Sequence, residues 1–252
     1  TNRQEYSTEI SIKDRIRVHQ FADLWLGWRT SQIQRDSQRT DGSRATHDDR
    51  TIHTPWIAFS HKLPFNTTGY ASYGQGVEAQ VTPNRNKYTN AGVALPSAKS
   101  NQKELGIKGA KNEWLWNAAI FDITRPVWGD QGTCEEANSC TRKLDGIAKH
   151  KGVELGIGYR NKQWKVDTAA TWLNAKRLEA MIDPTQNGQR PLNVPNLVVR
   201  AAAEYRWAQV PGLRTSLRLS HEGQRDLLEG GAMTLPAWTT ADLAAHYSTK
   251  VA

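Results

Sequence analysis

The sequence predicts an all-β fold in which an antiparallel sheet forms part of the wall of a transmembrane barrel. Many segments alternate apolar and polar residues, which places the two kinds of side chain on opposite faces of a strand. The connections between these segments alternate between a few residues and a dozen or more, as in membrane barrels. Ten Trp stand against four Phe, and Trp favours the membrane–water interface.

The clearest hairpin predicted by this pattern covers residues 152–172. Val153, Leu155 and Ile157 share one face of its first strand, and Glu154 lies on the other. A short turn at residues 161–162 leads to residues 164–172, which alternate in the same way. A half-buried sheet of a soluble protein has the same period, so alternation alone leaves open whether the apolar face meets a core or lipid.

About eleven strands are expected along the chain. They are residues 9–18, 24–31, 55–63, 67–76, 104–108, 114–126, 152–160, 164–172, 196–207, 213–222 and 239–247. In residues 114–126, Leu115, Ala119, Phe121 and Ile123 would point one way. Long loops are expected at residues 32–50, 77–97, 127–148 and 181–195, where turn-forming and polar residues gather.

Bulk composition narrows the classes of function. The mean hydropathy of −0.68 does not exclude a barrel, because only alternate residues of a spanning strand need to be apolar. No run approaches the roughly 18 apolar residues of a spanning helix. The formal charge of +8 is spread along the chain without a basic run, which argues against a nucleic-acid partner. The chain begins at Thr1 without a signal segment, so processing or truncation is expected to have removed one.

Seven motifs in order resemble the C-terminal half of TonB-dependent siderophore receptors. They are TPWIAFSHKLPFNTTGYASYGQGVE, LPSAKSNQKELGIKG, WLWNAAIFDITRP, KHKGVELGIGYR, WKVDTAATWLNAK, NGQRPLNVPNLVVRAAAEYR and LPAWTTADLAAHY. The resemblance implies a bacterial outer-membrane barrel of about 22 strands around an N-terminal plug, in contact with membrane lipid. It implies uptake of a ferric siderophore, energised through the TonB complex, with no enzymatic activity and no cofactor of its own.

The chain departs from the family pattern at both ends. Residues 1–252 would form a partial barrel domain, about the tenth to the twentieth strand, with the plug, TonB box and early strands missing before Thr1. The last two strands would lie beyond Ala252. The TonB complex would then contact the absent N-terminal region, and the end strands would be unpaired edges. Such a piece is not expected to insert or transport alone.

Cys134 and Cys140 are the only cysteines, and the resemblance places them in an extracellular loop. A disulfide is expected, because the periplasm that the protein would cross is oxidising. No further ligand is spaced for zinc, so no metal site is predicted. Gly74, Gly76 and Ala79 spell G-x-G-x-x-A, but no amphipathic helix follows to make a dinucleotide site. Catalytic motifs such as G-x-S-x-G are absent from the sequence.

Five residues are candidates for contact with the transported ligand, since the family uses aromatic and polar side chains of its loops and upper lumen. Trp56 and Trp238 are expected at lumen-facing upper strand ends, and Tyr88 and Trp128 in surface loops. Arg125 could attract an anionic chelate. Interface anchoring or loop packing is the alternative role for each aromatic residue.

Three other functions fit parts of the sequence. A passive channel and a receptor for cobalamin or a glycan would share the barrel pattern. A soluble β-rich binding module would instead bury the apolar faces in a core. The sequence does not name the siderophore, since specificity lies partly in the absent plug.

Overall fold

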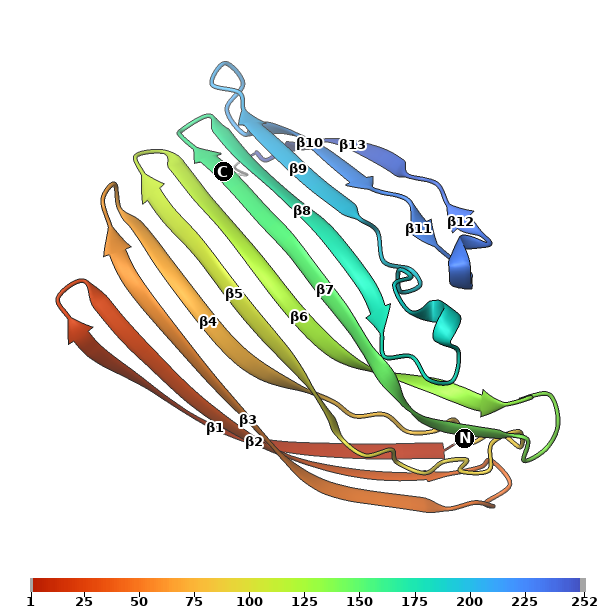
Figure 1. Ribbon diagram of the computed structural model, residues 1–252. Coiled ribbons are helices and arrows are strands. Elements are labelled where there is room, and N and C mark those ends of the chain that lie inside the picture. Colours follow the sequence, from red (N-terminus) through yellow and green to blue (C-terminus); the bar gives the residue numbers. More distant parts are fainter. Residues whose placement is uncertain (1, 250–252) are drawn as a thin grey trace.

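A computed structural model describes residues 2–249, and nearly all of its regular structure is β-sheet (Figure 1). Thr1 and residues 250–252, the ends discussed above, lie outside the described residues. The elements are β1 (Asn2–His19), β2 (Ala22–Gln38), β3 (Thr46–Leu63), β4 (Thr67–Glu78), β5 (Ala98–Lys111), β6 (Trp114–Gly132), β7 (Cys140–Arg160), β8 (Trp164–Leu178), η1 (Pro184–Gln186), β9 (Leu197–Arg206), β10 (Leu213–Glu222), β11 (Arg225–Asp226), η2 (Glu229–Gly231), β12 (Thr234–Leu235) and β13 (Trp238–Tyr247).

Eleven strands form one antiparallel sheet in the order β1-β2-β3-β4-β5-β6-β7-β8-β9-β10-β13. Figure 1 shows the sheet curving into an open trough, with short turns at one end and long loops at the other. Each hairpin turn has two to six residues, whereas the connections at the opposite end have seven to nineteen. We call these the turn end and the loop end. The predicted strand number, antiparallel pairing and alternation of connections are therefore confirmed.

The apolar side chains form one continuous surface across neighbouring strands, which we call the outward face. Leu155 lies opposite Ala118 on β6 and Ala170 on β8, and Leu217 lies opposite Leu243. Leu155 is 51% exposed and Leu217 41% exposed. No protein layer covers this face within the described chain, which contradicts the soluble module with an apolar core. The opposite, concave face carries Glu154 and Arg218.

Aromatic rings mark the outward face at the turn end. Trp114 and Tyr159 lie 4.8 Å apart between ring centroids, and Trp164 and Tyr205 lie 4.6 Å apart. Tyr205 also contacts Trp207 at 5.0 Å. These rings follow the strand ends from β6 to β9 and form a turn-end aromatic belt, as expected where a barrel meets the membrane interface.

The four residues of β6 that were expected to point one way do so, and the structure shows which face they share. Leu115, Ala119, Phe121 and Ile123 do share one side of the strand, but that side is concave, because Ala119 pairs with Glu154. The outward side carries Trp116, Ala118 and Ile120 instead. Both sides of β6 are apolar, so alternation gives no signal there. The apolar concave positions are partly filled by packing: Phe121 lies over Gly152, where a Cβ would come within 2.4 Å of its ring.

Two predicted loops are largely strand. The connection expected at residues 32–50 contracts to 39–45, because β2 and β3 stay paired up to Ser37 and Thr46. The connection expected at residues 127–148 contracts to 133–139, after a register shift between Pro126 and Trp128. These strand extensions carry polar residues on both faces, because neither face needs to meet lipid. Without an apolar face, the alternation of residues that predicts a strand is missing. The described residues include no helix long and apolar enough to cross a membrane.

Candidate ligand-binding face and loop rim

The concave face encloses an open hollow of about 1060 Å³ that runs from β4 to β13. Strand alternation turns polar side chains toward it, and the curvature of the sheet brings them to face one another. Charged and amide groups line it, namely Lys108, Asn117, Asp167, Arg200, Arg218 and Asp242. The lining is therefore suited to water or to a polar protein segment rather than to lipid.

Ion pairs tie neighbouring strands together on this face. Arg200 donates to Glu222 at 3.3 Å and to Ser220 at 2.5 Å, which links β9 to β10. Arg15 donates to Asp23 at 2.8 Å, which links β1 to β2. The lining of the hollow combines basic groups with acidic ones, so it presents charges of both signs.

Trp56 lies on the concave face, but inside β3 rather than at its end. The prediction of a strand end is wrong because β3 begins at Thr46 instead of near Pro55. The ring of Trp56 covers Gly27 on β2 so closely that a Cβ there would lie 2.0 Å from the indole. The glycine thus makes room for the ring, which remains 36% exposed. Contact of Trp56 with a ligand stays a prediction.

Replacing Gly27 by alanine should displace the Trp56 ring and lower the free energy of unfolding by about 1–3 kcal/mol, the usual cost of overpacking. Urea unfolding of the complete protein in detergent, followed by Trp fluorescence, would measure the loss. Gly158→Ala is the matched control, because its Cβ would come no closer than 3.3 Å to Asp167. Equal stability of the two variants would contradict the proposed packing.

Arg125 reaches the concave side near the loop end, where its charge is already paired. Its Nε donates to Glu78 at 2.9 Å and its Nη2 donates to the other carboxylate oxygen at 3.1 Å. This two-point geometry holds the guanidinium across the intervening strand β5. An anionic ligand would therefore meet a neutralised pair at this position. Attraction of a chelate by Arg125 stays a prediction.

Tyr88 and the disulfide form a small packed unit between two loops. Cys134 and Cys140 are bonded, as expected, with an S–S length of 2.08 Å. Tyr88 is 3% exposed beside Cys140, and its hydroxyl donates to Asp130 at 2.6 Å. The backbone N–H of Thr89 donates to the Cys140 carbonyl at 2.8 Å. The phenol thus packs the loop base, and a ligand would reach it only if these loops separated.

The two remaining predicted contacts, Trp128 and Trp238, lie far apart in the sheet. Trp238 begins β13 opposite Glu222, which confirms its place at a strand end on the concave side. Trp128 belongs to the extended part of β6 and pairs with Leu144, so its expected place in a loop is wrong. Because β3, β6 and β13 are separated by other strands, the structure does not bring the predicted contacts together in one pocket.

A buried ion pair near the loop end was missed by the sequence analysis. Arg177 donates to Asp145 at 2.8 Å, with side chains 8% and 3% exposed. The other oxygen of Asp145 accepts hydrogen bonds from the backbone N–H groups of Met181 and Ile182 at 2.8 and 3.0 Å. The pair therefore fixes the start of the long loop between β8 and β9. No sequence signal joins residues that lie 32 positions apart.

Comparison with known proteins gives consistent matches. A model of the family described as TonB dependent receptor-like, beta-barrel matches residues 1–251. The ferrichrome receptor FcuA of Yersinia enterocolitica is 27% identical over 195 residues, which are 77% of this chain and 24% of that protein.

Two solved structures share the fold. BauA, the ferric preacinetobactin receptor of Acinetobacter baumannii, has a TM-score of 0.78 and 21% identity over 99% of this chain and 37% of that chain. The siderophore receptor PiuA of the same organism has a TM-score of 0.77 and 17% identity over 98% of this chain and 37% of that chain. The chain thus spans less than two fifths of the length of these relatives.

Proposed function

Because this chain belongs to the TonB-dependent receptor-like β-barrel family, we propose that it is part of the wall of an outer-membrane receptor that takes up a ferric siderophore. The proposal rests mainly on the two faces of the sheet: a continuous exposed apolar face lies opposite a polar concave face. The family model also matches residues 1–251 of the chain. Such a sheet is stable where its apolar side meets hydrocarbon and its polar side meets a hydrated interior.

The relatives support the choice of cargo. The names of FcuA and BauA identify a ferrichrome receptor and a ferric preacinetobactin receptor, and PiuA is named as a siderophore receptor. The cargo class proposed for this chain is accordingly a ferric chelate. The family acts in transport and not in catalysis, and the residues of the concave face make hydrogen bonds and ion pairs that suit binding and positioning.

The complete protein would supply the parts needed for transport. We infer that β1 and β13, the two edges of the described sheet, pair with further strands that close the barrel. A plug would occupy the hollow on the concave face, and the TonB complex would contact the region that carries the plug. The loops at the loop end would face the outside and meet the chelate first.

Under iron limitation, deletion of the gene should abolish growth when at least one ferric siderophore is the only iron source. Complementation with the complete gene should restore that growth. Uptake of the ⁵⁵Fe-labelled chelate measures transport directly. A proton uncoupler should stop uptake by the complemented strain, whereas uptake that persists would indicate a passive channel. Unchanged uptake of every siderophore tested after the deletion would contradict the proposal, and loss of cobalamin or glycan uptake instead would redirect it.

A further inference from the structure

Charged side chains are distributed unevenly around the outward face. Within residues 2–63, the outward positions of β1, β2 and β3 hold three aspartates, Asp14, Asp36 and Asp49, and no lysine or arginine. The outward positions of β5 and β8, and of β6 and β7 on the turn-end side of the register shift near Pro126, hold six lysines and one aspartate. One wall therefore has an acidic side and a basic side.

The acidic side reaches the loop end through Asp36 on β2 and Asp49 on β3, which we call the acidic flank. The two strands are neighbours, and Asp36 lies 2.7 Å from the ring of His47. Both carboxylates are exposed. Hydrogen bonds from Gln32 and Gln34 hold the pKa of Asp49 below its usual range. Asp49 therefore presents a negative charge even when His47 is protonated.

The basic side reaches the same end through five lysines. We call them the lysine flank: Lys99, Lys103, Lys149, Lys151 and Lys176. Lys149 on β7 lies directly opposite Lys176 on β8, and like charges in opposite positions destabilise a sheet. Asp122 lies 3.4 Å from the Lys149 ammonium and 3.7 Å from that of Lys151. One carboxylate cannot neutralise five ammonium groups, so the lysine flank keeps an excess of positive charge.

The two flanks lie at nearly the same height above the turn end. Asp36 and Asp49 are fourteen residues from the turn-end limits of β2 and β3, and Lys99 and Lys176 are twelve residues from those of β5 and β8. With about 3.3 Å per residue and a tilt of about 40°, these strand lengths correspond to rises of roughly 35 and 30 Å. Both rises exceed the lipid-facing band of about 25 Å, so the charged groups lie just outside the hydrocarbon.

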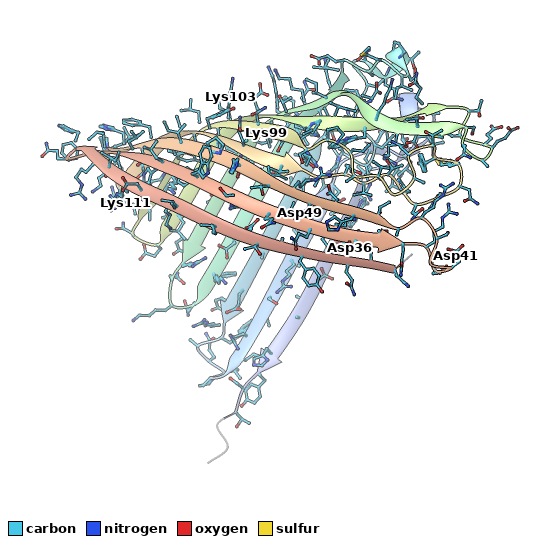
Figure 2. All side chains as sticks on the ribbon, turned by 90° about the horizontal axis from the view of Figure 1, so that it is seen from below. Asp36, Asp41, Asp49, Lys99, Lys103 and Lys111 are labelled. Carbon is cyan, nitrogen blue, oxygen red and sulfur yellow. A yellow bond between two sulfur atoms is a disulfide. The ribbon has the colours of Figure 1, made fainter. Side chains whose placement is uncertain are left out.

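The two flanks point in different directions around the wall. Figure 2 shows Asp36 and Asp49 on one side of the curved sheet and Lys99 and Lys103 on another. The middle of the acidic flank is four to five strands away from the middle of the lysine flank. In a barrel of about 22 strands each strand turns the wall by about 16°, so the flanks are separated by roughly 65–80°. One copy cannot join its own two flanks, whereas two copies can.

We propose that the acidic flank of one receptor contacts the lysine flank of a second copy in the plane of the membrane. The inference rests on the proposed function, which supplies the closed barrel and its orientation. The contact is head-to-tail, because it joins two different surfaces of the same chain. A ring of three or four copies has corners of about 60° or 90°, which bracket the angle between the flanks. Opposite charges at one height steer the encounter and fix the register of the copies.

Zero-length cross-linking of the complete receptor tests the contact without any variant. Copies labelled with ¹⁴N and with ¹⁵N are mixed in phosphatidylcholine vesicles, which contain no anionic glycolipid, and treated with a carbodiimide that joins carboxylates to ammonium groups. Mass spectrometry should find Asp36 or Asp49 of one isotope joined to a lysine of the lysine flank of the other. Cross-linked products should extend to three or four copies. Absence of mixed-isotope links between the flanks, or products that stop at two copies, would overturn the proposal.

Charge reversal provides a second test, read as energy transfer between donor- and acceptor-labelled copies in the same vesicles. Asp36→Lys with Asp49→Lys should weaken association about tenfold, because two attractive contacts become repulsive. Lys149→Glu with Lys176→Glu should weaken association to a similar extent. An equal mixture of the two double variants should recover the energy transfer of the wild type, because each variant supplies the charge that the other lacks. This recovery also shows that both variants are folded.

Two exposed lysines at the turn end supply the matched control. Lys111→Glu with Lys162→Glu changes the charge by the same amount outside the lysine flank, and should associate like the wild type. A mixture that does not recover although both variants keep heat-modifiable migration, or association that requires added lipid A, would overturn the proposal. Ferric-chelate binding on the same samples separates the two ideas: lost association with intact chelate binding leaves the transport function standing, and intact association without chelate binding does the reverse.

Discussion

Asp145→Ala is expected to lower the free energy of unfolding by about 3–5 kcal/mol, because it leaves the buried Arg177 guanidinium without its counter-ion. The substitution also removes the acceptor for the N–H groups of Met181 and Ile182. Hydrogen exchange at these two amides should accelerate in the complete protein, and urea unfolding in detergent should give the total loss. The loop between β8 and β9 should loosen first.

Two variants separate the buried charge from the loop itself. Asp183→Ala changes a partly exposed carboxylate in the same loop, where hydrogen bonds from Thr185 and Gln186 hold the pKa of Asp183 below its usual range. Its effect on global stability should be small. Replacing both charged partners, as Asp145→Leu with Arg177→Met, should recover much of the lost stability. A single Asp145→Ala variant as stable as Asp183→Ala would refute the role given to the pair.

Ala201→Arg is expected to destabilise the receptor in lipid by about 2–4 kcal/mol, because it places a charge near the middle of the outward face. Ala201 pairs with Thr168 and Leu219, and it lies four residues above Tyr205 of the turn-end aromatic belt. Unfolding of the complete receptor from lipid vesicles by urea, detected through loss of its heat-modifiable migration, measures the effect.

The neighbouring residue provides the control for this experiment. Ala202→Arg adds the same side chain to the concave face of the same strand, between Asp167 and Arg218. It should be nearly neutral in lipid, since an acidic and a basic neighbour flank it in a hydrated hollow. Equal destabilisation by the two substitutions would show that the faces are not exposed to different solvents, and the proposed membrane orientation would fail.

The strands that cross the membrane could be predicted from sequence because lipid imposes a period of two on them. The hairpin of β7 and β8 keeps this pattern from Val153 to Trp172, and its pairing follows the expected parity. Alternation predicted which residues of β6 share a side but not which side faces outward, because Phe121 packs over Gly152 and makes the concave side apolar as well. Alternation also misses the loop-end extensions of β2 and β3, where the paired residues Gln34 and Asp49 are both polar and the pattern predicts a loop.

The predicted ligand contacts show a different limit. The alternation of side chains along the strand correctly placed Trp238 at a strand end on the concave face. It could not reveal that Tyr88 is buried beside Cys140 or that Arg125 is paired with Glu78. Such facts depend on loop packing and on side chains that meet across an intervening strand. Pairing of Arg125 with Glu78 brings together residues 47 positions apart, for which a single sequence contains no local signal.

The sequence by itself determined the strand alternation and the order of short and long connections, because both follow from local residue order. The disulfide followed from the family resemblance, which implies passage through an oxidising compartment. Only the tertiary structure decided which face of β6 looks outward, where the strands end beyond the membrane, and which charges are neutralised. These properties arise from the register between strands and from the curvature of the sheet. Both place side chains from distant parts of the chain within contact distance.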